Sequence, residues 1–138
     1  MRLAPLLLIC LAGGAPAPEP ELSEAIDVFS GEADLARGET LSLACQACHT
    51  LGEGEAVLLG PNLYGVFGRV SASSGDFAYS NALRAAGIVW TPEALDEWLG
   101  SPEEFLPGNN MAFAGYSSAQ DRRDLIAFLL HKTGAVSE

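Results

Sequence analysis

Apolar residues recur with a helical period in the first strongly patterned segment, residues 32–45. Leu35, Gly38 and Leu41 follow one another at helical spacing. Two acidic residues, Glu32 and Asp34, stand where the first turn is expected, and the helix dipole favours negative charge there. The pattern predicts a helix that ends at a pair of cysteines.

Two further helices are predicted between residues 80 and 101 from their start and stop signals. The stretch SNALRAAG begins with Ser80 as a capping residue and stops at Gly87. The stretch TPEALDEWLGSP has Thr91 as a cap and Pro92 in the first helical position. Its expected buried stripe consists of Leu95, Trp98 and Leu99.

A last helix is predicted from about Ser118 to Gly134. Its apolar face consists of Leu125, Ile126, Phe128 and Leu129. Between the helices lie a glycine-rich loop over residues 51–75 and a Pro–Gly loop, FLPGNNMAFAGY, over residues 105–116. No segment alternates with a period of two, so the fold class expected is all-α with long connections.

The N-terminal residues have the pattern of an export signal. The apolar run from Leu3 to Gly14 is shorter than the roughly 20 residues that span a bilayer, and Ala15-Pro16-Ala17 gives a small-x-small cleavage pattern. We therefore expect a signal peptide over 1–17, with an uncleaved membrane tether as the alternative. An extended, acidic, Pro-rich linker over 18–30, one domain over 31–134 and a tail over 135–138 would follow.

The charge of the chain is strongly acidic. It carries 18 acidic and 7 basic residues, a formal net charge of −11. Nucleic acid is therefore not an expected partner, since binding phosphates requires a basic face. Membrane contact is expected only through partners or through an uncleaved N-terminus.

The motif Cys45-Gln46-Ala47-Cys48-His49 is compatible with three chemistries. A dithiol redox centre usually follows a strand in a βαβ unit, whereas this motif follows a predicted helix. A structural zinc site needs four ligands, and His131 is the only further His or Cys once the signal is removed. Covalent attachment of haem needs little beyond the motif itself, which makes it the favoured interpretation.

A haem iron bound by His49 would need a second axial ligand. Met111 is the only methionine apart from Met1, and it lies in the Pro–Gly loop between two predicted helices. A thioether opposite an imidazole raises the reduction potential of the iron and suits electron transfer rather than oxygen binding. We therefore expect Met111 to be that ligand.

From about Gly38 to Lys132 the chain resembles the class I c-type cytochromes, similar to the soluble mitochondrial and purple-bacterial ones. The matching stretches are GETLSLACQACHT, GPNLYGVFGR, FAYSNALRAAGIVW, LPGNNMAFAGY and DLIAFL. The resemblance implies a small fold of helices and long loops around one haem c. It makes Cys45 and Cys48 the thioether anchors and His49 and Met111 the metal ligands.

The resemblance also implies roles for residues around the haem. The carbonyl of Pro61 would accept a hydrogen bond from His49 and fix its ring. Arg69, Tyr79 and Trp90 match residues that hold a haem propionate, and Phe113 matches an aromatic that shields the haem edge. Two positions depart from the family pattern: Trp98 replaces a tyrosine that contacts the methionine sulfur, and Ser42 replaces a core aromatic.

The function implied is a monomeric one-electron carrier in the periplasm, not an enzyme. Its partners would be a quinol-oxidising complex and a terminal oxidase, a reductase or a photosynthetic reaction centre. The alternative is a haem peroxidase or gas sensor with a labile sixth ligand.

Relatives surround the haem edge with lysines, and the matching positions here hold none. These positions are Ala44, Leu58, Glu103, Glu104, Asn110, Ser117 and Ser118. We expect the partner's docking face to be neutral, apolar or basic, with Leu58 and Leu59 in the contact. An unchanged apolar contact inside a merely solvating acidic surface is the alternative.

Overall fold

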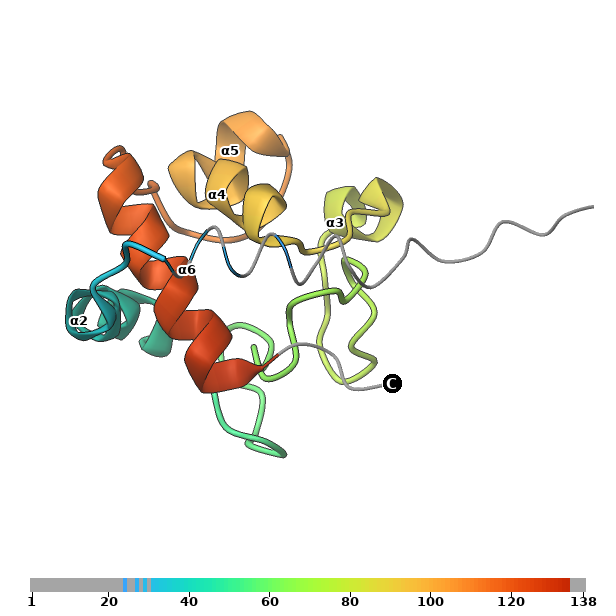
Figure 1. Ribbon diagram of the computed structural model, residues 1–138. Helices are drawn as coiled ribbons and strands as arrows, with labels where there is room; N and C mark the ends of the chain where they lie inside the picture. Colours follow the sequence, from blue (N-terminus) through green and yellow to red (C-terminus); the bar gives the residue numbers. More distant parts are fainter. Residues whose placement is uncertain (1–23, 25–26, 28, 30, 135–138) are drawn as a thin grey trace, which may run out of the picture.

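The computed structural model describes residues 24, 27, 29 and 31–134, and five helices lie within residues 31–134 (Figure 1). They are α2 (Leu35–Gln46), α3 (Asn81–Ala86), α4 (Pro92–Gly100), α5 (Pro102–Phe105) and α6 (Ala119–Thr133). α6 packs against α2 and against α4, which also contacts α5. Apart from isolated bridge residues, including the pair Val70 and Val89, the described residues form no strand, so the predicted all-α class with long loops is confirmed.

The helix predicted over 32–45 begins three residues later than expected. Asp34 is the N-cap, with extended backbone, and its side chain accepts a hydrogen bond from the Arg37 amide at 3.0 Å. The first turn therefore contains no acidic residue. The prediction that Glu32 and Asp34 lie inside that turn is wrong, because a capping aspartate stands outside the helix that it starts.

The crossing of α2 and α6 depends on a glycine. A Cβ atom on Gly38 would lie 2.7 Å from the Asp124 carbonyl carbon and 2.7 Å from Phe128 Cβ, closer than non-bonded carbons pack. The two helices therefore approach backbone to backbone here. The Asp124 carboxylate, 1% exposed, closes the contact by accepting the Asp34 amide at 3.0 Å.

Replacing Gly38 by alanine is expected to lower the free energy of unfolding by about 1–3 kcal/mol, since the added methyl group forces the helices apart. Urea unfolding of the two proteins measures this. Gly75→Ala is the matched control, because a Cβ there would have no neighbour within 4 Å. Equal stability of the Gly38→Ala variant and the unmodified protein would show that the crossing is not tightly packed.

The other predicted helices begin and end at the expected signals. Ser80 Oγ accepts the Leu83 amide at 3.2 Å, and Gly87 ends α3 in the left-handed conformation. Thr91 Oγ1 accepts the Ala94 amide at 3.2 Å, with Pro92 in the first turn of α4. The residues predicted to face the core are all buried: Leu95, Trp98, Leu99, Leu125, Ile126, Phe128 and Leu129.

Helix α5 was not predicted, because its four residues are too few for a hydrophobic period. Pro102 begins it and is buried, and Ser101 provides no side-chain cap. The Asn109 amide group closes the turn that follows by donating to the carbonyls of Pro102 and Leu106, both at 3.0 Å. A tertiary hydrogen-bond pattern, rather than local propensity, holds this segment.

The N-terminal predictions fall mostly outside the described residues. The signal peptide (1–17) and the tail (135–138) lie there, as does most of the linker (18–30). Within the linker, the described residues Glu24, Asp27 and Phe29 are helical, so the extended conformation predicted for them is wrong. In the part of the chain that is described, no helix has the length and apolar character needed to cross a membrane.

Candidate functional site

The two cysteines lie at the point where α2 ends. Cys45 is in the last turn, and the amides of Cys48 and His49 both donate to its carbonyl, at 3.0 and 2.8 Å. Cys45, Cys48 and His49 therefore lie in one continuous turn of the backbone. Both thiols are free and partly buried, and burial raises the pKa of Cys45 to about 11. Each thiol is thus available for bond formation rather than paired in a disulfide.

The ring of His49 is held by one backbone carbonyl. Its Nδ1 lies 2.6 Å from the Pro61 oxygen. Because a carbonyl only accepts, Nδ1 carries the proton and Nε2 keeps a lone pair. Burial lowers the pKa of His49, although the hydrogen bond to Pro61 opposes that shift. The ring is therefore neutral at neutral pH, which is the form that binds metal ions.

A glycine next to Pro61 allows this contact. A Cβ on Gly60 would lie 2.7 Å from His49 Nδ1 and 2.8 Å from Nε2. The Gly60 amide also donates to the Cys48 carbonyl at 2.8 Å, so the loop backbone lies directly against the motif. No role for Gly60 was predicted from the sequence. Its position just before Pro61 in a glycine-rich loop is the only local signal that could have indicated one.

The loop that carries Met111 is held by the side chain of Asn109, a role that was not predicted from the sequence either. Asn109 donates to the two carbonyls around α5, and its Oδ1 accepts the Met111 amide at 2.9 Å. The Met111 side chain is partly buried and packs against the core. An asparagine after Pro–Gly is a common turn residue, which explains why its clamping role was not distinguished from an ordinary turn.

The residues expected at a propionate lie near one another. Trp90 N donates to the Arg69 carbonyl at 2.9 Å, which joins their two segments. The Arg69 guanidinium donates to Ser74 Oγ and to the Asn62 carbonyl, both at 3.0 Å. Burial lowers its pKa, while Tyr79 and then Asp76 act in the opposite direction. Its described hydrogen bonds go to neutral oxygens, so the guanidinium keeps its charge available for an anionic group.

Aromatic rings occupy the remaining expected positions. Trp98 is 6% exposed and meets Trp90 edge-on, with ring centroids 5.3 Å apart, and Phe105 at 6.0 Å. Phe113 is partly buried and lies against Tyr116 at 5.2 Å. Trp98 thus belongs to a packed aromatic cluster.

Ser42, the other residue that departs from the family pattern, is fully buried. Its hydroxyl donates a hydrogen bond to the Glu39 carbonyl at 2.7 Å, so the hydroxyl is satisfied.

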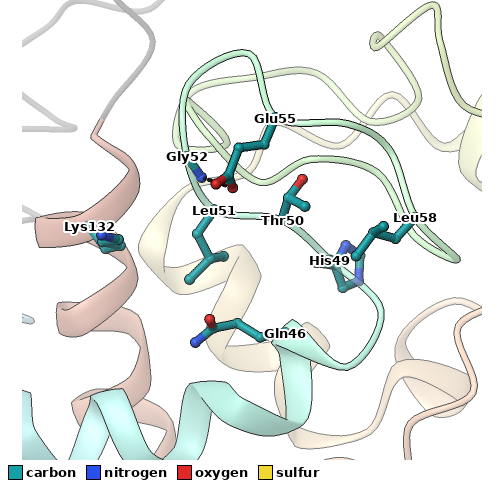
Figure 2. A pocket seen from close by; sticks show the side chains of 8 residues that line it. All are labelled: Gln46, His49, Thr50, Leu51, Gly52, Glu55, Leu58 and Lys132. Carbon is teal, nitrogen blue, oxygen red and sulfur yellow. Dashed lines mark hydrogen bonds between the residues drawn. The ribbon is translucent and has the colours of Figure 1, made fainter.

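A pocket of about 330 Å³ lies beside the motif (Figure 2). His49 and Leu58 line one part of it, and Lys132 of α6 lines another. No three His, Cys, Asp or Glu side chains gather in a metal-binding cluster within the described residues, so His131 does not join the motif. The motif itself offers two thiols and a neutral imidazole, and the one thioether of the described residues, Met111, lies on the loop between α5 and α6.

This donor set fits a covalently bound haem. Thiols form thioether bonds to such a group, and an imidazole and a thioether are the usual pair of ligands for its iron in electron carriers. Partly buried apolar and aromatic side chains, of the kind that suits a flat apolar ring, pack against the core. They are Leu63, Leu83, Trp90, Met111 and Phe113.

Comparisons with known proteins agree with this chemistry. The family model described as cytochrome c matches residues 35–133. The chain is 46% identical over 103 residues to cytochrome c of Stellaria longipes, covering 74% of this chain and 95% of that one. It is 43% identical over 102 residues to cytochrome c2 of Agrobacterium tumefaciens, covering 72% and 92%.

A solved structure gives the same result for the fold. Cytochrome cH from Methylobacterium extorquens superposes with a TM-score of 0.68 at 36% identity, covering 72% of this chain and 100% of that one. The class I cytochrome c fold predicted from the sequence is confirmed. The chain belongs to the cytochrome c family of haem-based electron carriers, and its cofactor is a covalently attached haem c.

Proposed function

We propose that this protein is a one-electron carrier in which His49 and Met111 bind the haem iron and Cys45 and Cys48 anchor the haem. The observation that carries the proposal is the contact between His49 Nδ1 and the Pro61 oxygen, 2.6 Å, which leaves the Nε2 lone pair free to bind a metal, at the residue directly after the second cysteine. Met111 is the only methionine in the described residues, and Asn109 fixes its backbone. These are the donors that a low-spin electron carrier needs.

When bound, the haem supplies an iron that exchanges one electron. The residues of the chain do the rest. Pro61 keeps the imidazole oriented and increases its donor strength. Asn109 fixes the backbone of the Met111 segment, and Arg69 offers a positive charge to a propionate. The buried side chain of Trp98 excludes water from the interior. Ligands held this rigidly would move little when the charge of the iron changes.

The cellular role proposed is transport in a respiratory or photosynthetic chain. Residues 1–17 would direct export to the periplasm, leaving residues 31–134 as the working domain behind the linker 18–30. Proteins of the cytochrome c family exchange electrons with partner redox proteins, and we expect the same of this protein. A quinol-oxidising complex is the proposed donor, and a terminal oxidase, a reductase or a photosynthetic reaction centre is the proposed acceptor, each meeting a monomer of this chain.

Carbon monoxide tests the carrier function. The reduced protein is expected to refuse carbon monoxide, because both axial positions would be occupied by His49 and Met111. Optical titration of the dithionite-reduced protein with the gas measures this. Ready binding would contradict the proposal, and would favour a peroxidase or gas sensor with a labile sixth ligand.

A further inference from the structure

The segment that carries Met111 runs from α5 to α6 and is held at both of its ends (Figure 1). Before Met111, the Asn109 side chain fixes the segment to α5. After Met111, Gly115 has a φ of +99°, and a Cβ there would lie 2.7 Å from the Gly100 carbonyl carbon at the end of α4. Between these ends, residues 110–114 make no described hydrogen bond except to Asn109 and to one another. The position of Met111 therefore depends on how firmly the two ends are held.

Tyr116 is the residue that holds the second end. Its amide donates to the Leu99 carbonyl of α4 at 2.8 Å, and its carbonyl accepts a hydrogen bond from the Arg122 guanidinium of α6 at 2.9 Å. Its hydroxyl donates to the Leu41 carbonyl of α2 at 3.1 Å. Three helices are therefore joined at one residue a short distance along the chain from Met111.

The hydroxyl bond of Tyr116 joins the two segments that carry the haem-binding residues. Within the described residues, it is the only hydrogen bond between residues 106–117 and α2, whose last turn contains Cys45. Burial raises the pKa of Tyr116, so the hydroxyl keeps its proton at neutral pH and can donate. The Tyr116 ring meets Phe113 edge-on, with ring centroids 5.2 Å apart, and a phenylalanine at position 116 would keep that contact. The bond can therefore be removed without removing the packing.

We propose that the Tyr116 hydroxyl is a latch: bonded to α2 it keeps Met111 on the iron, and its release lets the Met111 segment open to a small ligand. This inference rests on the proposed electron-carrier function and adds the side chain that controls opening of its site. Residues 110–114 have no described bond to the helices, so displacement of Met111 is expected to move the held end and break the hydroxyl bond. Tyr116 is a positioning residue, because it acts through Met111.

Added imidazole measures the opening, because it competes with the Met111 sulfur for the ferric iron. The far-red absorption band of iron-bound sulfur falls as imidazole replaces it, so a titration of the oxidised holoprotein at neutral pH gives an apparent affinity. That affinity rises in proportion to the population of the open form. Tyr116→Phe should bind imidazole about fivefold more tightly than the unmodified protein, the factor that one neutral hydrogen bond contributes.

Two comparisons separate a latch from an ordinary stabilising hydroxyl. Tyr64→Phe is the matched control, because Tyr64 is 42% exposed and its hydroxyl makes no described hydrogen bond, and it should bind imidazole as the unmodified protein does. Urea unfolding of the same proteins gives their global stability. If Tyr116→Phe lowered the free energy of unfolding but left the imidazole affinity unchanged, the hydroxyl would only stabilise the fold, and the proposal would be overturned.

The unmodified protein distinguishes failure of the latch from failure of the function. If it shows the far-red band and refuses carbon monoxide when reduced, while Tyr116→Phe binds imidazole no more tightly than it does, only the latch is rejected. If it lacks the band and binds carbon monoxide readily, the electron-carrier function is rejected, and the latch with it. The band, refusal of the gas and tighter imidazole binding in Tyr116→Phe alone would together support both.

Discussion

Replacing both motif cysteines, Cys45→Ser with Cys48→Ser, is expected to abolish covalent attachment of the haem completely. A hydroxyl does not form the thioether that a thiol forms, and the described residues contain no other cysteine. The geometry around the motif would survive, since the amides of Cys48 and His49 donate to a backbone carbonyl. Acid–acetone extraction of protein made together with haem-ligation machinery should remove all pigment from the double variant and none from the unmodified protein.

Single variants and a neighbouring control make this result specific. Each single variant should keep one thioether bond to the haem, so the mass of the variant protein should include one haem. Ala47→Ser changes an exposed residue between the cysteines and should leave attachment intact. Pigment that resists extraction in the double variant would mean that another residue holds the haem.

Removing the thioether of Met111 is the change with the next largest expected effect. Both Met111→Ala and Met111→Leu should lose the far-red absorption band that arises from sulfur bound to ferric iron. Both should bind carbon monoxide to saturation when reduced, whereas the unmodified protein is expected to refuse it. The reduction potential should fall, because a thioether ligand raises it. Optical spectra and redox titration measure these changes.

The two replacements are chosen to separate ligation from packing. Leucine nearly conserves the volume of methionine, so Met111→Leu keeps the packing against the core and removes only the sulfur. Asn110→Ala alters the exposed residue next to Met111 and should keep the band. If Met111→Leu kept the band and refused carbon monoxide, the sixth ligand would be another residue.

Helices with strong end signals could be predicted from the sequence, and a short helix held by tertiary contacts could not. Ser80 and Thr91 cap helices as expected, and Ser118 caps the helix predicted to begin near it, because a capping hydroxyl acts within three residues. Helix α5 depends instead on the Asn109 side chain folding back onto Pro102. The late start of α2 has the same kind of cause, since the Asp34 amide donates to Asp124 on α6.

Part of the candidate site could likewise be predicted from the sequence, and part could not. The cysteines and His49 are adjacent in the chain, so their chemistry could be inferred directly. The partner of His49, Pro61, came only from the family resemblance, and the structure places its oxygen at 2.6 Å. The roles of Gly60 and Asn109 could not be predicted, because each depends on a close approach between segments that local sequence does not encode.

The most direct test of the account is the signal of one methyl group. Met111 is the only methionine after Met1, so protein labelled with ¹³C at the methionine methyl gives one assignable resonance for it. If its sulfur binds the haem iron opposite His49, the methyl group lies over the ring, and in the reduced protein its proton signal is expected far upfield of the ordinary methionine range. A methyl signal within the ordinary range in the reduced protein would contradict the account.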